Sequence, residues 1–136
     1  MKRVLIIDDD VEMANAVKYV IQSLSASCSC TVVTDPYDAL LEVADNVFDL
    51  VLVDQHIPGL FGSDILKHAD EFIDADPILK QSDAYKVPVK VVLMSGSEEI
   101  HQLELKFHHF SVTDSVQKKD LTQFLKNYFQ EQEATL

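Results

Sequence analysis

Short apolar runs alternate along this chain with longer amphipathic stretches. Four runs and a weaker fifth are rich in Val, Leu, Ile and Thr: Val4–Ile7, Thr31–Val33, Leu50–Val53, Val89–Met94 and Val112–Val116. The third and fourth runs are almost continuously apolar, which is typical of strands that are buried on both faces of a parallel sheet. We therefore expect five strands, with the two central ones fully covered.

Between these runs, apolar residues recur at the spacing of amphipathic helices. The order of elements is then a strand followed by a helix, five times over. This order predicts an α/β fold with a doubly wound parallel sheet and right-handed crossovers. The predicted helices are Val11–Ser23, Pro36–Asn46, Ser63–Asp76, Glu98–Phe107 and Asp120–Gln130.

Length and charge narrow the class of protein. The 136 residues predict a single domain over 1–136, and 11 basic against 23 acidic residues give a net charge of −12. This charge argues against a nucleic-acid partner, because phosphate contacts need clustered Lys and Arg. No apolar run approaches the roughly 20 residues that cross a bilayer, so we expect no membrane insertion. Cys28 and Cys30 are too few for a disulfide framework, and with no export signal they predict a cytoplasmic protein.

One stretch, about residues 64–88, is longer than a strand–helix unit requires. It carries Asp70, Glu71, Asp74 and Asp76 before Pro77, and predicts an acidic helix, a break and a further short helix. We interpret it as a solvated extension, with a partner-specific surface as the alternative. The tail 131–136 is expected to fray.

Acidic, hydroxyl and basic residues follow the predicted strands. Asp8-Asp9-Asp10 come after the first strand and Asp54 after the third, while Ser95-Gly96-Ser97 follow the fourth and Lys118-Lys119 the fifth. Ligands of open α/β sheets bind beyond these strand ends. Three carboxylates that converge there repel one another unless a cation joins them, and oxygen ligands suit Mg²⁺ or Mn²⁺.

Simpler interpretations remain open for several of these residues. Asp9 with Glu12 has the spacing of a capping box, and Ser97 is a good N-cap for the fourth helix. His101, His108 and His109 are interpreted as a solvated helix end, because no Cys or carboxylate accompanies them at ligand spacing. Lys118 alone would be an ordinary surface lysine.

Taken in order, the motifs match those of a known family. An acid pair follows the first strand at Asp8 and Asp9, and a further acid follows the third strand at Asp54. Ile57-Pro58 supplies the hydrophobic–proline pair after that acid, and Gly62 stands at the family's glycine position.

The second half of the chain continues the match. Ser95-Gly96 gives a hydroxyl and a small residue after the fourth strand, and Lys118 follows the fifth, in step with Leu125 and Phe129 of the last helix. Over about residues 2–130 the chain resembles the receiver domain of two-component response regulators. The resemblance implies a flavodoxin-like (βα)5 sheet of order 2-1-3-4-5.

The resemblance also implies a function. Asp54 would accept a phosphoryl group from a histidine kinase or a histidine phosphotransfer protein, with Lys118, Ser95 and Gly96 binding phosphoryl oxygens. Asp8, Asp9, Asp54 and the main-chain carbonyl of His56 would hold Mg²⁺. His56 and Ser97 would tune the loss of phosphate. Output would reach an unknown downstream target through partners, since no output domain fits in this length.

Two positions depart from the family pattern. Lys119 stands where most members have Pro, so that Lys119 competes with Lys118 as the active lysine, and Ser115 replaces an aromatic residue that reports phosphorylation.

Alternative functions are a hydrolase of haloacid-dehalogenase type, with Asp8 as nucleophile and Asp10 as acid/base, and a docking module that works without phosphorylation. A flavin-binding flavodoxin fits least, because acids occupy the loop where a phosphate would bind.

Overall fold

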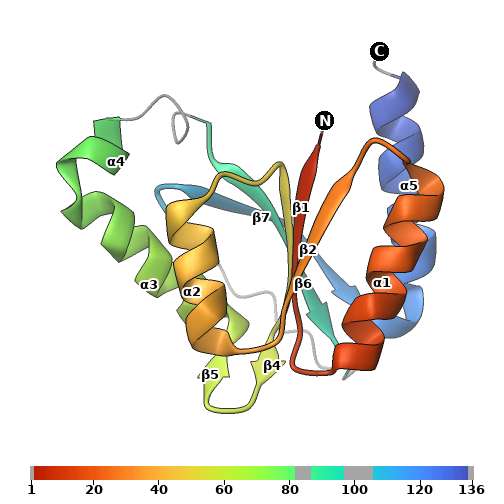
Figure 1. Ribbon diagram of the computed structural model, residues 1–136, viewed down its shortest axis with the longest axis horizontal. Coiled ribbons are helices and arrows are strands. Elements are labelled where there is room, and N and C mark those ends of the chain that lie inside the picture. The colour runs from red at the N-terminus through yellow and green to blue at the C-terminus, as the bar shows by residue number, and fades with distance from the viewer. Residues whose placement is uncertain (1, 82–86, 97–105, 135–136) are drawn as a thin grey trace.

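Five parallel strands form the central sheet, in the order β2-β1-β3-β6-β7 (Figure 1). The computed structural model describes residues 2–81, 87–96 and 106–134. Counting the long strands alone, this order is the predicted 2-1-3-4-5 order, so the flavodoxin-like prediction is confirmed. The strands are β1 (Arg3–Ile7), β2 (Ser29–Val33), β3 (Leu50–Asp54), β6 (Val89–Ser95) and β7 (Phe110–Gln117).

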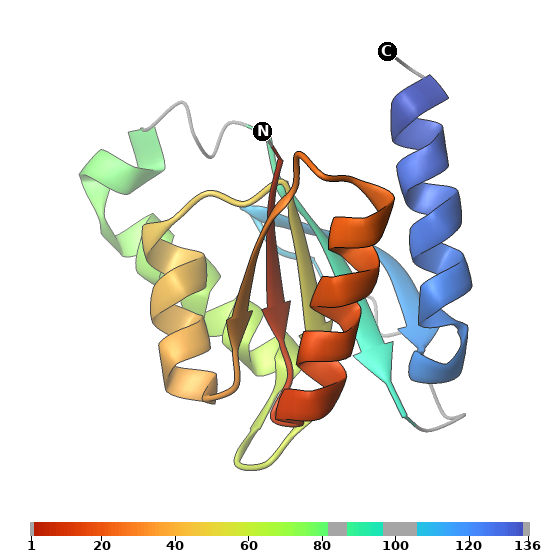
Figure 2. The same ribbon diagram turned by 45° about the vertical axis from the view of Figure 1, so that its right-hand side comes forward.

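Helices cover both faces of the sheet, as Figure 2 shows. On one face α1 (Val11–Leu24) and α5 (Leu121–Ala134) pack against β1, β3 and β6, and on the other α2 (Pro36–Asp45) and α3 (Gly62–Ala75) do so. All five residues of β3 are buried, as its continuous apolar sequence predicts. The sheet therefore has two separate hydrophobic cores, one on each face.

A short hairpin that the sequence pattern did not predict follows β3. Its strands β4 (His56–Ile57) and β5 (Leu60–Phe61) are antiparallel, and Gly59 adopts a φ of 89° in the turn between them. Pro followed by a residue of positive φ is the sequence of a type II turn. Two-residue strands are too short to leave a periodic signal.

Other boundaries also differ from the predicted ones. The strand β7 begins at Phe110, two residues before the predicted start, and α5 continues to Ala134. Residues 131–134 continue this helix, because Glu, Gln and Ala are good helix formers. The helix predicted over Glu98–Phe107 falls largely on residues outside the described part of the chain.

The acidic stretch has the predicted break, but one of its four acids is not solvated. A short helix α4 (Pro77–Gln81) begins at Pro77, directly after α3. Asp70, however, is buried, and Asp74 contacts both His108 and His109. The interpretation of these histidines as a solvated helix end is therefore wrong for His109, which is buried, and a carboxylate does accompany them.

Candidate functional site

The candidate site lies at the carboxyl ends of the central strands. Ile7 pairs with Val53 in the parallel register of β1 and β3, so Asp8 and Asp54 both follow residues at the same level of the sheet. Asp54 in turn pairs with Met94 of β6, and Ser95 pairs with Gln117 of β7. The sheet register thus brings four segments of the chain to one edge, as the sequence predicts.

Lys118 joins the two buried carboxylates of the site. Its Nζ lies 2.9 Å from Asp8 Oδ2 and 3.0 Å from Asp54 Oδ2. Asp8 is 1% exposed and Asp54 is 4% exposed, whereas the Lys118 side chain is 22% exposed. Lys119 is exposed one residue further along, in the short 3-10 turn that leads into α5. The structure therefore places Lys118, and not Lys119, against the acids.

Burial and charge shift the ionisation of this group. Burial raises the pKa of Asp54 above its ordinary value, and the charge of Asp8 adds to the rise, although the His56 N–H and Lys118 oppose it. Burial alone would lower the pKa of Lys118, but its bonds to Asp8 and Asp54 outweigh this and the net shift is upward. Lys118 consequently stays charged at neutral pH.

Asp9 stands at the rim of the site. Asp9 is exposed, and one carboxylate oxygen from each of Asp8, Asp9 and Asp54 lies within 4.8 Å of the others. The capping-box interpretation of Asp9 and Glu12 is wrong, because α1 begins at Val11 and Asp10 Oδ1 accepts the N–H of Met13 at 3.2 Å. Asp9 is thus not needed as the cap of the helix.

The donor set fits a hard divalent cation. Three carboxylates and one ammonium group leave two uncompensated negative charges, which one Mg²⁺ ion would neutralise. All the candidate ligands are oxygens, which Mg²⁺ prefers over nitrogen and sulfur.

Backbone contacts hold Asp54 in place. The His56 N–H donates to Asp54 Oδ1 at 3.0 Å, and the Gln55 N–H donates to the Met94 carbonyl at 2.9 Å. The Gln55 side chain spans to α3, where its Oε1 accepts the Ser63 N–H at 3.0 Å and its Nε2 contacts Ser63 Oγ at 3.1 Å. Sequence reasoning missed Gln55, since its pairing with a residue eight positions away depends on the hairpin between them.

Gly62 is required by a close approach of two backbones. A Cβ atom there would lie 2.6 Å from the Asp54 carbonyl oxygen and 3.0 Å from Val53 Cγ2. The first residue of α3 therefore packs directly on the end of β3, and a side chain would push the two apart.

The remaining predicted site residues lie around the same edge. Ser95 is buried at the end of β6, and Gly96 is exposed beside it. His56 has an exposed side chain, whose ring contacts that of Phe61 edge-on at a centroid distance of 6.1 Å. Ser115 is exposed on β7, and Ser97 lies outside the described residues.

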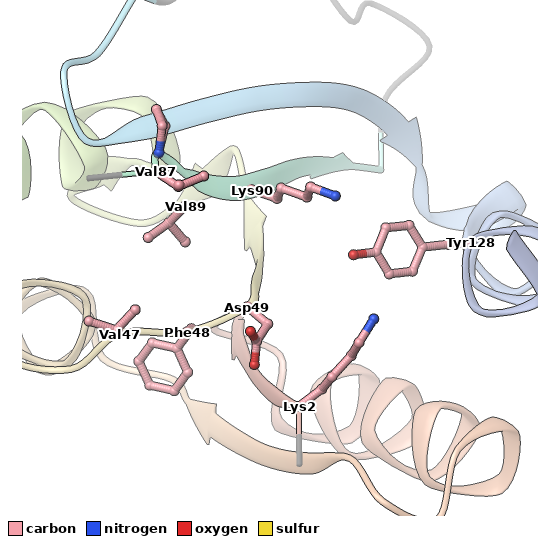
Figure 3. Close-up of a pocket in the computed structure, with 9 residues that line it drawn as sticks. Lys2, Val47, Phe48, Asp49, Val87, Val89, Lys90 and Tyr128 are labelled. Carbon is pink, nitrogen blue, oxygen red and sulfur yellow. The ribbon is translucent and has the colours of Figure 1, made fainter. Parts of the chain in front are cut away.

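A hollow of about 400 Å³ lies away from the acidic cluster (Figure 3). The side chains of Lys2, Lys90 and Tyr128 point toward one another there, and Asp49 is the one acid among the lining residues. Burial raises the pKa of Tyr128, so its hydroxyl stays protonated at neutral pH. A single carboxylate beside two lysines does not supply the ligands of a divalent cation, so the residues that line this hollow do not form a metal site like the one at Asp54.

Comparison with known proteins gives a consistent family. A family model described as the response regulator receiver domain matches residues 4–128. No curated protein matches the chain. None of the helices in the described part of the chain is long and apolar enough to cross a bilayer.

Solved structures share the fold at low sequence identity. The response regulator protein TrrA from Thermotoga maritima, in complex with Mg²⁺ and BeF, has a TM-score of 0.70 at 19% identity, over 96% of this chain and 98% of that one. A CheY-like receiver domain from Methylobacillus flagellatus has a TM-score of 0.67 at 20% identity, over 96% and 98%. A CheY-like receiver domain protein from Methanospirillum hungatei has a TM-score of 0.65 at 18% identity, over 100% and 99%.

Proposed function

The chain belongs to the family of response regulator receiver domains, and we propose that it is a phosphorylation switch with Asp54 as its phosphoacceptor. The observation that carries this proposal is the contact of Lys118 Nζ with both Asp54 and Asp8, at 3.0 and 2.9 Å. A lysine held at that place puts a positive charge beside the oxygen that would receive the phosphoryl group.

The transfer step needs positioning more than acid–base chemistry. A carboxylate oxygen of Asp54 attacks the phosphorus of a phosphohistidine, the P–N bond breaks, and its electron pair stays on the imidazole nitrogen, which takes up a proton. The His56 N–H holds Asp54 Oδ1, which leaves the carboxylate in a fixed orientation. Lys118 exchanges its contact with Asp54 for one with a phosphoryl oxygen.

We assign the metal to the same acids. Asp9, Asp54 and the main-chain carbonyl of His56 would hold Mg²⁺, with Asp8 acting through bound water. A divalent ion bound there would offset the negative charge of the incoming phosphoryl group. The exposure of Asp9 at the rim leaves it available as a ligand, which supports this assignment. The TrrA structure was solved with Mg²⁺ and BeF, in keeping with the same ligand class in this chain.

Ser95 and Gly96 are proposed to complete the phosphoryl site. The Ser95 hydroxyl and the Gly96 N–H would each donate to a phosphoryl oxygen, and movement of Ser95 toward it would be the switch. His56 and Ser97 would set how fast water removes the phosphate. Because Ser115 replaces the family's aromatic residue, the output of this chain does not depend on an aromatic side chain at that position.

The partners follow from this chemistry. A histidine kinase or a histidine phosphotransfer protein would supply the phosphoryl group, and an unknown protein target would read the phosphorylated state, both in the cytoplasm. Family membership favours this function over a hydrolase that uses Asp8 as nucleophile. A docking module that works without phosphorylation is the alternative that experiment must separate.

An NMR titration tests the proposal. Backbone amide spectra of the full chain are recorded with Mg²⁺, before and after addition of beryllofluoride, which mimics a phosphoryl group. We expect shifts at Asp54, Ser95 and Gly96, and none in an Asp54→Asn variant that lacks the accepting carboxylate. Mg²⁺-dependent shifts without any response to beryllofluoride would instead favour the docking module.

A further inference from the structure

Two histidines and an aspartate from distant parts of the chain meet near the end of α3. His108 Nδ1 lies 2.6 Å from Asp74 Oδ2, and His109 Nε2 lies 2.8 Å from Asp74 Oδ1. One nitrogen of each ring and a carboxylate oxygen all lie within 4.8 Å of one another. Such a set of two imidazoles and one carboxylate differs in kind from the all-oxygen site at Asp54.

Asp70 fixes the backbone of both histidines. Its Oδ2 accepts the His108 N–H at 2.9 Å, and its Oδ1 accepts the His109 N–H at 2.8 Å. The His109 carbonyl in turn accepts the Val89 N–H of β6 at 2.9 Å. Asp70 is buried and precedes Asp74 by one helical turn, so the two acids lie on the same side of α3. The fold thus holds the histidine backbones in place from two neighbouring elements.

We propose that Asp74, His108 and His109 form a second metal site, which takes a borderline cation such as Zn²⁺. Neutral imidazole and carboxylate are both common ligands of Zn²⁺ in proteins, whereas Mg²⁺ prefers oxygen alone. Ligands at about 2.0–2.1 Å around a tetrahedral ion stand roughly 3.3 Å apart. The observed N–O separations of 2.6 and 2.8 Å are therefore each within about 1 Å of that spacing.

The exposure of the three side chains makes the site open on one side. The His109 side chain is 10% exposed and that of Asp74 is 28% exposed, but that of His108 is 75% exposed. Three protein ligands leave one tetrahedral position for water or for a side chain of another molecule. The same exposure lets the His108 ring turn toward the ion without disturbing the core.

The proposed site lies far from the phosphoacceptor and does not depend on the function proposed for Asp54. The helix α3 packs on Asp54 at its first residue, Gly62, and carries Asp74 in its last turn. Its 14 residues span about 21 Å at 1.5 Å per residue. A bound ion would clamp the end of α3 to the segment that enters β7, and leave the acidic cluster free for Mg²⁺.

Zinc binding to the metal-stripped full chain tests this proposal. Calorimetric titration with ZnCl₂ is run in excess Mg²⁺, which competes with zinc for the all-oxygen site at Asp54. We expect one Zn²⁺ per chain and, in NMR spectra of the imidazole nitrogens, shifts of two histidine rings. Because loss of an outer partner of a metal ligand already costs about 10–100-fold in affinity, His108→Ala and Asp74→Asn should each weaken zinc binding at least about tenfold.

A matched control lies on the same helix. His68 stands 3.8 Å from Glu71, and both side chains are more than half exposed, so His68→Ala should bind zinc as the wild type does. His108 is the safest ligand to remove, because its side chain is 75% exposed and we expect its loss to leave the core unchanged. Absence of zinc binding by the wild type, or binding that His108→Ala does not weaken, overturns the proposal.

Discussion

Replacement of Gly62 by Ala is the perturbation that the geometry of the site defines best. The added Cβ would lie 2.6 Å from the Asp54 carbonyl oxygen, and ordinary contact begins at 3.4 Å, so the two backbones must separate by 0.8 Å. No side-chain rotation relieves this contact, because the nearest atom belongs to the main chain. The change thus acts directly on the residue that we propose as phosphoacceptor.

Both stability and phosphoryl transfer should suffer. Overpacking of a close contact costs about 1–3 kcal/mol, so we expect the free energy of unfolding to fall by roughly 2 kcal/mol. A misplacement of about 1 Å of a reacting group lowers a rate by about a hundredfold. We therefore expect Gly62→Ala to take up phosphate from a small phosphodonor on the order of a hundred times more slowly than the wild type.

Gly59→Ala is the matched control for this variant. Gly59 has a φ of 89°, a conformation that costs a non-glycine residue about 1–2 kcal/mol, but no atom lies within 4 Å of its missing Cβ. The control should lose similar stability in urea denaturation and keep its phosphorylation rate within about twofold of the wild type. Equal phosphorylation rates in the two alanine variants would show that the contact between Gly62 and Asp54 does not control phosphorylation, because stability alone would then account for both rates.

Three further predictions concern the groups around Asp54. Lys118→Ala leaves two buried carboxylates without their counter-ion, so it should lower the free energy of unfolding by about 3–5 kcal/mol and slow phosphorylation by about 10²–10³-fold. Lys119→Ala should change the free energy of unfolding by less than about 0.5 kcal/mol. Equal effects of the two variants would contradict the assignment of Lys118. The pKa of Asp54 is raised in the folded chain, so between the ordinary and the raised pKa the folded chain binds more protons than the unfolded chain, and stability should fall as pH rises through this window. Urea denaturation of Asp54→Asn without Mg²⁺ should lack that fall. A pH profile of stability that is unchanged in this variant would show that Asp54 does not cause the fall. His56→Ala should change the half-life of the phosphorylated chain, measured by phosphate release, and an unchanged half-life would exclude a role for the exposed ring.

The sheet and its site edge were predictable because they depend on local signals. The continuous apolar sequence of β3 indicates a strand buried on both faces, and the strand–helix alternation fixes a parallel arrangement. In a parallel sheet every carboxyl end lies at one edge, so Asp8, Asp54 and Lys118 had to lie near one another once the strand order was known.

The features that sequence reasoning missed depend on contacts between distant residues. The pairing of Asp70 and Asp74 with His108 and His109 joins positions 34 to 39 residues apart, and no periodicity records it. The same residues appear in the sequence as an acidic helix and a polar loop, which individually are ordinary surface features. Gln55 was missed for a related reason, since its contacts with Ser63 exist only because the β4–β5 hairpin closes between them.

Identifying the residue that carries the phosphoryl group tests the assignment of Asp54 as the phosphoacceptor. The full chain is incubated with Mg²⁺ and a labelled phosphodonor, and incorporation is measured for the wild type, Asp54→Asn and Asp8→Asn. We expect stoichiometric, Mg²⁺-dependent incorporation in the wild type, none in Asp54→Asn, and a label that peptide mapping of the wild type places on Asp54. Incorporation that survives in Asp54→Asn, or a label that maps to Asp8, would show that Asp54 is not the phosphoacceptor.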